Sequence, residues 1–211
     1  MATPTIRRYV ALGDSLSEGF SDWGRSERSI GFAYVLADLL REQIPDLEFT
    51  NLGESGARVA DVLHQQVDRA TELAPDLLTL VVGANDLLTT PDEQFQHDYD
   101  DLVGRLRSKT SGMIAIANIP DFAHLLPPQY GTYRAPLSNR TREFNHIIAA
   151  TAATYGVLLV DLAASREVED LRNLSGDGFH PNARGYRAMA RIFAEALNDA
   201  GFELRLPVLD P

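Results

Sequence analysis

The stretch Tyr9-Val10-Ala11-Leu12-Gly13-Asp14-Ser15-Leu16-Ser17 is a short apolar run that passes into a turn of small and polar residues. Residues 9–12 predict a buried strand, and the residues that follow lead toward a helix. Four similarly short apolar runs are also predicted as strands, at residues 47–52, 77–82, 113–119 and 157–160. Short apolar strands that alternate with helices are typical of a parallel sheet covered on both faces.

Between the predicted strands, apolar residues recur at helical spacing. The five stripes are Phe32, Val35, Leu36, Leu39 and Leu40; Val59, Val62, Leu63, Gln66, Val67 and Ala70; Phe95, Tyr99, Leu102, Val103 and Leu106; Phe144, Ile147, Ile148, Thr151 and Tyr155; and Tyr186, Met189, Ala190, Phe193 and Leu197. Two helix starts are indicated as well: Thr90 opens a capping-box pattern with Pro91 at the first helical position, and Asn182 can cap the last helix. We therefore predict an α/β protein, a three-layer α/β/α sandwich with about five parallel strands in a flavodoxin-like arrangement.

Composition limits both the number of domains and the kinds of partner. The 211 residues are 45% hydrophobic and 23% charged, without a flexible linker or a repeat, which favours a single domain over residues 1–211. A net charge of −11 argues against nucleic acid and anionic lipid as partners, because both attract clustered Lys and Arg. The chain has no cysteine, so disulfides, thiol catalysis and thiolate metal sites are excluded.

The amino-terminal residues bear on localisation. The segment before Tyr9 has no apolar signal region, and no apolar run reaches membrane-spanning length. If Met1 is the natural start, we expect a cytoplasmic protein; a mature secreted fragment restarted with Met would have the same sequence. The oligomeric state is not indicated by the sequence.

Four polar blocks follow predicted strands. They are Gly13-Asp14-Ser15-Leu16-Ser17, Ser55-Gly56, Gly83-Ala84-Asn85-Asp86 and Asp177-Gly178-Phe179-His180-Pro181-Asn182. In a parallel sheet every strand-to-helix loop lies at the same edge, so the fold is expected to bring these blocks together. They contain a hydroxyl, a small backbone donor, an amide and a carboxylate–imidazole pair, which are the groups used in acyl-transfer catalysis.

Ser15 is the candidate nucleophile, although Gly-Asp-Ser alone fits a helix-entry hydroxyl equally well. A serine hydroxyl needs a base at neutral pH. His180 is the candidate base, because three other histidines lie in predicted helices and only His124, in a long loop, is a rival. Asp177 precedes His180 by three residues, so one turn can aim its carboxylate at the imidazole Nδ1. The same segment is also a turn before a helix, and the two roles are compatible.

The tetrahedral intermediate of acyl transfer needs fixed hydrogen-bond donors. The N–H groups of Ser15 and Gly56 and the side-chain amide of Asn85 are the candidates for this oxyanion hole. Gly53 lies close to Gly56 and competes with it for the role. Gly and Asn at the end of a strand are also common in ordinary turns.

The remaining polar features are interpreted as structural. Asp14 and Asp86 are predicted to be local hydrogen-bond anchors. No pair of histidines has a metal-ligand spacing, and the acidic pair at residues 100–101 has the pattern of a solvated helix face. No metal site is predicted.

Residues 120–137 interrupt the alternation of strands and helices, because they form a connection longer than usual with four prolines and three aromatic residues. We interpret this segment as the wall of a pocket rather than as a connection without a functional role. Phe122 and Tyr130 in this segment, with Phe20 and Trp23 after the nucleophile turn, are candidate substrate-binding residues, although ordinary packing would also explain each of them. Small acyl groups are expected rather than long lipids.

At these residues the chain resembles the SGNH/GDSL hydrolase superfamily. The family's Ser, Gly, Asn and His correspond to Ser15, Gly56, Asn85 and His180, and its triad aspartate corresponds to Asp177. The resemblance extends from the first predicted strand to the final helix. It implies an esterase, lipase, lysophospholipase, thioesterase or carbohydrate deacetylase that acts on a small-molecule ester without a cofactor.

Two other interpretations belong to different functional classes. A phosphate- or flavin-binding module could use residues 13–19, which are rich in Gly and Ser, because helix N-termini attract anions. The negative charges of Asp14 and Glu18 oppose this. A relative that binds its ligand without turnover is the third interpretation, and the complete set of functional groups argues against it.

Overall fold

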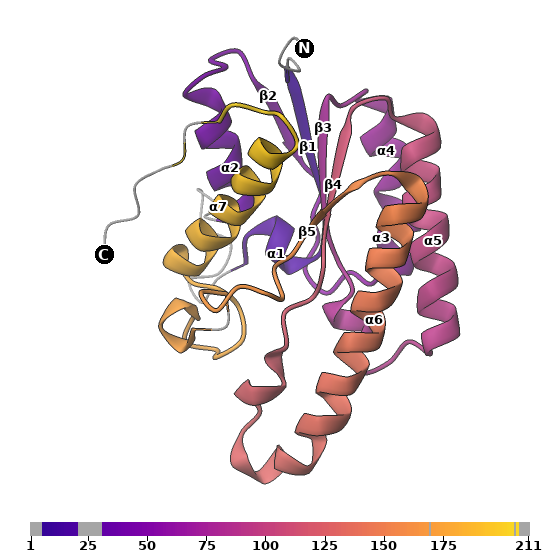
Figure 1. Cartoon of the computed structure of the whole chain (residues 1–211), viewed down its shortest axis with the longest axis vertical. Helices are drawn as coiled ribbons and strands as arrows, with labels where there is room; N and C mark the ends of the chain where they lie inside the picture. The colour runs from indigo at the N-terminus through magenta and orange to yellow at the C-terminus, as the bar shows by residue number, and fades with distance from the viewer. Residues whose placement is uncertain (1–5, 21–30, 169, 205, 207–211) are drawn as a thin grey trace.

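The computed structural model describes residues 6–20, 31–168, 170–204 and 206. Its centre is a sheet of five parallel strands in the order β2-β1-β3-β4-β5 (Figure 1). The strands are β1 (Arg8–Gly13), β2 (Glu48–Asn51), β3 (Leu77–Val81), β4 (Met113–Ala117) and β5 (Leu158–Val160). This is the flavodoxin-like strand order, so the predicted fold class is confirmed.

Helices cover both faces of the sheet. They are α1 (Ser15–Glu18), α2 (Phe32–Arg41), α3 (Val59–Gln65), α4 (Val67–Glu72), α5 (Asp92–Lys109), α6 (Arg134–Tyr155) and α7 (Ala183–Asp199). Figure 1 shows α2 and α7 on one side and α3, α4, α5 and α6 on the other. This arrangement is the three-layer sandwich that the apolar stripes predict.

Successive side chains of β1 pack alternately into two hydrophobic cores, one on each face of the sheet. Tyr9 and Ala11 pack in the cluster that contains residues of α2 and α7, whereas Val10 and Leu12 pack in the cluster that contains residues of α3, α5 and α6. Successive side chains of a strand point to opposite faces, so a continuous apolar run is what a doubly covered strand requires.

The fourth strand is shorter than the predicted 113–119. It ends at Ala117, and two residues later Asn145 of α6 bonds both backbone groups of Ile119, each at 2.8 Å. A side-chain amide thus replaces a strand as the hydrogen-bond partner. The predicted helical stretch over residues 59–70 also differs, because it forms two helices, α3 and α4, separated at Gln66.

The two predicted helix starts have different outcomes. Asn182 caps α7 as predicted, since its Oδ1 accepts from the N–H groups of Arg184 and Gly185. The prediction of a capping box at Thr90 is wrong. The helix α5 begins after Pro91 without a side-chain cap, and the hydroxyl of Thr90 donates instead to a carboxylate outside the helix.

The long connection at residues 120–137 has structure of its own. It contains two 3₁₀ helices, η2 (Phe122–Leu125) and η3 (Pro128–Tyr133), and α6 already begins at Arg134. Pro136 lies in the first turn of α6, where a missing N–H leaves no hydrogen bond unmade. The connection therefore ends earlier than predicted.

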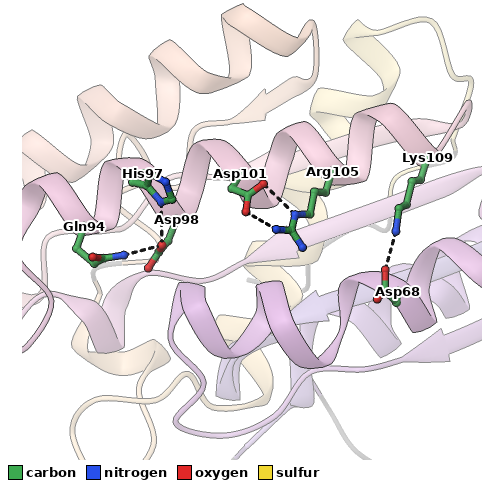
Figure 2. A network of polar contacts seen from close by, with 7 residues as sticks. All are labelled: Asp68, Gln94, His97, Asp98, Asp101, Arg105 and Lys109. Atoms are coloured by element: carbon green, nitrogen blue, oxygen red, sulfur yellow. Dashed lines mark hydrogen bonds and ion pairs between the residues drawn. The ribbon is translucent and has the colours of Figure 1, made fainter.

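The outer surface of α5 is polar. Figure 2 shows Arg105 bonded to Asp101 one turn earlier, and Lys109 reaching Asp68 of α4 at 2.7 Å. Exposed pairs of this kind contribute little to stability, because water and salt screen their charges. Asp101 therefore belongs to the solvated helix face that the sequence predicts.

None of the helices in the described parts of the chain is long and apolar enough to cross a membrane. The same residues contain no group of three or more His, Asp or Glu side chains placed to hold a metal ion.

Candidate active site

The position of Ser15 is set by the turn that ends β1. Gly13 has φ +132°, and a Cβ there would lie 1.9 Å from the carbonyl oxygen of Val81, so only glycine fits. Asp14 then caps α1 by accepting the N–H of Leu16 at 3.0 Å. Ser15 is the first residue of this one-turn helix, and it is buried at 7% exposure.

The imidazole of His180 reaches Ser15 from the segment before α7. Its Nε2 lies 3.0 Å from Ser15 Oγ, and its Nδ1 lies 2.6 Å from Oδ2 of Asp177. The other carboxylate oxygen of Asp177 accepts the N–H groups of Phe179 and His180, both at 2.9 Å. The structure therefore brings together the three residues that the sequence predicts as nucleophile, base and orienting acid.

The charge state of Asp177 fixes the direction of these hydrogen bonds. Burial acts to raise the pKa of this carboxyl, but the hydrogen bonds from the ring and backbone of His180 and from the N–H of Phe179 outweigh it, so the pKa lies below its ordinary value. An ionised carboxylate only accepts hydrogen bonds, so Nδ1 of His180 donates to it. Nε2 is then free of a proton and can accept the hydroxyl of Ser15.

The segment that carries His180 is held in place by its own backbone. Ser175 donates its N–H to the carbonyl of His180 at 2.7 Å and its hydroxyl to that of Pro181 at 3.0 Å. Gly178, at φ +70°, makes the turn between Asp177 and the histidine. This segment is both a turn before a helix and the support of the imidazole, as the sequence suggests.

His124, the alternative candidate for the base, makes a different contact. It is in η2, and its Nδ1 is 2.8 Å from the backbone oxygen of Asp121 in its own turn. The hydroxyl of Ser15 faces His180 instead.

Gly56 and Asn85 come from neighbouring loops that are bonded to each other. Asn85, in η1 (Ala84–Asp86), donates its side-chain N–H to the carbonyl of Ala57 at 2.9 Å. Gly56 has φ +83°, and a Cβ there would meet no atom within 4 Å. Among the described residues, the N–H groups of Ser15 and Gly56 have no hydrogen-bond partner.

The competing glycine has a packing role. A Cβ on Gly53 would lie 2.6 Å from the backbone nitrogen of Glu18 in α1. The loop can therefore approach this helix only if position 53 has no side chain. Glu18 then accepts the N–H of Ser55 at 2.8 Å and also its hydroxyl. These contacts seat the Ser55–Gly56 block against the helix that carries Ser15.

Asp14 and Asp86 are the anchors that the sequence predicts. Asp86 accepts the N–H of Val59 at 3.1 Å and the hydroxyl of Thr90 at 2.7 Å, so it ties η1 to α3. Burial raises the pKa of both carboxyls, that of Asp14 to about 7, and the negative charge of Asp86 adds to the effect on Asp14.

Comparison with known proteins identifies the family. The model of the GDSL-like lipase/acylhydrolase family matches residues 11–188, which include all the residues described above. This chain belongs to the GDSL family. It is thus a carboxylic ester hydrolase by family, as the sequence motifs imply.

Individual relatives agree with this assignment. An acetylxylan esterase of Geobacillus stearothermophilus is 26% identical over 93% of this chain and 94% of its own length. Two solved structures share the fold: LAE5, an α/β hydrolase from the Lake Arreo metagenome (TM-score 0.74, 22% identity, 94% and 97% of the two chains), and the esterase EstA of Pseudoalteromonas (TM-score 0.72, 18% identity, 92% and 98%).

Aromatic rings surround the imidazole of this GDSL-family protein. Phe20 lies 4.7 Å from the ring centre of His180, and Phe179 packs edge-on against it at 5.1 Å. Phe122 contacts Phe179 at 5.2 Å. Of the predicted substrate residues, Phe20 thus lies beside the imidazole, whereas Phe122 contacts Phe179. Phe179 is not among the residues predicted from the sequence, because it stands between the residues of the Asp177–His180 motif that have a predicted role.

The other two predicted substrate residues are Trp23 and Tyr130. Trp23 is outside the described residues. Tyr130 lines an apolar groove of about 470 Å³, between η1 and the start of α6, whose walls also include Leu88, Leu126 and Leu137. A larger hollow, of about 810 Å³, lies between α5 and α6; its described lining is mostly polar and contains none of the predicted site residues.

Proposed function

We propose that this GDSL-family enzyme hydrolyses carboxylic esters through an acyl-enzyme formed on Ser15. The observation that carries the proposal is the continuous chain from hydroxyl to imidazole to carboxylate, with distances of 3.0 Å and 2.6 Å. These are the hydrogen-bond distances at which a base can take a proton from a nucleophile and a carboxylate can orient that base.

The first half of the reaction transfers the acyl group to the enzyme. Ser15 Oγ attacks the ester carbonyl carbon while its proton passes to Nε2 of His180, and Asp177 stabilises the imidazolium. The tetrahedral intermediate then expels the alcohol, which takes the proton from His180. In the second half, water attacks the acyl-enzyme with His180 again as base, and the acid and free Ser15 are released.

The developing oxyanion needs donors that are already in place. The N–H groups of Ser15 and Gly56 support this role because neither has a partner among the described residues. The amide of Asn85 carries two hydrogens, and Ala57 takes one of them, so the second can reach the substrate. Loss of one such donor typically slows catalysis about 10²- to 10³-fold.

The groove beside η1 is the proposed acyl site. Leu87 and Leu88, which line it, directly follow η1, so the loop that carries the proposed oxyanion donor Asn85 also forms a wall of the groove. Its walls are mostly leucine and tyrosine side chains, together with Pro136 and Arg140, and its volume is within the range of small-molecule sites. This favours an ester with an apolar acyl chain over a carbohydrate acetyl ester, the activity that the acetylxylan esterase relative suggests.

Substitution of Ser15 tests the mechanism. Ser15→Ala is expected to abolish hydrolysis of p-nitrophenyl acetate and labelling by a fluorophosphonate probe, with an unchanged circular dichroism spectrum. Ser108→Ala is the matched control, because Ser108 is an exposed serine of α5 that bonds only within its own helix. Activity of Ser15→Ala equal to that of the unmodified enzyme would rule the acyl-enzyme out.

A substrate panel tests the acyl site. We expect kcat/KM to rise from p-nitrophenyl acetate to the butyrate and hexanoate esters, and to exceed the value for an acetylated xylo-oligosaccharide. Leu126→Asp should lower the values for the longer chains while leaving that for acetate within about twofold. A preference for the acetylated sugar would assign the enzyme to the deacetylases instead.

A further inference from the structure

Gln66 is a buried polar residue that lies outside the proposed catalytic groups. It separates α3 from α4 and is only 4% exposed. Both ends of its side-chain amide bond one residue: Oε1 accepts the N–H of Gly13 at 2.9 Å, and Nε2 donates to the carbonyl of Gly13 at 3.0 Å. The amide therefore takes the place of a strand beside the last residue of β1.

Gly13 is the point where β1 passes into the nucleophile turn. Strand β2 ends at Asn51, so its ladder with β1 does not reach this residue. The carbonyl of Gly13 also accepts the N–H of Glu54, at the start of the Ser55–Gly56 block. The backbone of Gly13 is thus bonded both to the side chain of Gln66 and to the loop that carries Gly56, a proposed oxyanion donor.

We propose that Gln66 is a positioning residue for the reaction: it fixes the Gly13 backbone and thereby holds Ser15 in line with His180 and with the Gly56 loop. The inference rests on the proposed function, because it assigns the purpose of the constraint to the nucleophile. The chemistry tolerates little movement, since the hydroxyl must stay about 3 Å from the imidazole nitrogen, and a displacement of about 1 Å can cost about 100-fold in rate.

The helices do not need this side chain. The backbone N–H of Gln66 bonds to Val62 at 3.0 Å, and its carbonyl accepts from Ala70 at 2.9 Å, so the helical hydrogen bonds continue across the break. A residue of similar length without polar atoms would preserve these bonds. It would leave the N–H of Gly13 buried and unpaired, and it would remove one of two donors from the Gly13 carbonyl.

Gln66→Met is the direct test, with Gln65→Met as the matched control on the exposed neighbour. For p-nitrophenyl acetate we expect kcat to fall about 10- to 100-fold in Gln66→Met, with KM within about twofold and a parallel fall in the rate of fluorophosphonate labelling. Gln65→Met should match the unmodified enzyme. A folded Gln66→Met with kcat within about twofold of the unmodified enzyme would overturn the inference.

Gln66→Glu gives a second test, the pH dependence of activity, which would not change if Gln66 only filled space. The protonated acid can both accept from and donate to Gly13, whereas the ionised form has no hydrogen to donate. The activity ratio of Gln66→Glu to the unmodified enzyme should therefore fall steadily from pH 6 to pH 9. A ratio that does not change with pH overturns the inference, and this result decides the matter if Gln66→Met does not fold. Activity retained by Ser15→Ala would instead defeat the proposed function, so the two failures are distinguishable.

Discussion

Replacement of Asp14 by asparagine is expected to make the stability of the protein less dependent on pH. Asp14 is 1% exposed, and burial, together with the charge of Asp86, raises its pKa to about 7. The N–H of Leu16 donates to its side chain, and the oxygen of an asparagine can accept this bond as well. Asp14→Asn therefore removes the ionisable group while keeping the shape and the cap of α1.

The size of the effect follows from proton linkage. An unfolded aspartate ionises at about pH 3.9, whereas the folded protein keeps this proton until about pH 7. Between these values the folded state binds about one proton more than the unfolded state, so the free energy of unfolding falls as the pH rises. At about 1.4 kcal/mol per pH unit, the loss due to Asp14 is about 2 kcal/mol between pH 5.5 and pH 8.

Urea unfolding at pH 5.5 and pH 8 measures this loss. The unmodified protein should lose about 2 kcal/mol more than Asp14→Asn between the two conditions. Asp38→Asn serves as the control, because Asp38 is a surface aspartate whose side chain is 77% exposed, and its replacement should leave the pH dependence as it is. If Asp14→Asn and the unmodified protein change in parallel, Asp14 is ionised in the folded state across this range, and the reasoning fails.

Three further substitutions probe the supports of the site. Asn182→Ala removes the cap of α7 together with two bonds to loop carbonyls, and should lower the free energy of unfolding in urea by about 2 kcal/mol; a loss below about 0.5 kcal/mol would contradict this. Gly13→Ala should prevent folding, because its Cβ would lie 1.9 Å from a backbone oxygen, whereas Gly131→Ala, with nothing within 4 Å, should change stability by less than about 0.5 kcal/mol. Asp177→Asn should lower kcat about 10⁴-fold by favouring the wrong tautomer of the imidazole, and a loss of less than tenfold in an esterase assay would show that the carboxylate is dispensable.

Features governed by local pattern could be predicted from the sequence. All five strands overlap the segments predicted for them, and the three central strands β1, β3 and β4 are nearly continuous buried runs, as strands covered on both faces require. The meeting of Ser15 with His180 could also be predicted, although 165 positions separate them. Parallel topology brings strand-to-helix loops to one edge whatever their separation in the chain.

Features governed by contacts between distant side chains could not be predicted. Gln66 reads as one more member of a helical stripe, and nothing in its neighbourhood indicates that its amide pairs with Gly13, 53 positions earlier. Thr90 fits a capping box, yet its hydroxyl bonds Asp86. Tyr130 and Phe122 are grouped in the prediction because they share a loop, but Phe122 packs against Phe179 whereas Tyr130 lines the groove beside η1, since a loop that contains two 3₁₀ helices can present its side chains to two places.

The edge of a parallel sheet brings loops together without fixing their conformations, so the site must be braced by side chains that take no part in the chemistry. Among the described residues, three braces of this kind each bond a backbone group of a different loop or helix: Gln66 bonds Gly13, Glu18 bonds Ser55, and Asp86 bonds Val59. Because every brace ends on a backbone N–H or C=O group, the side chains at the bonded positions can change without loss of the contact. The Ser15 turn is therefore held by contacts that do not depend on which side chains occupy the bonded positions.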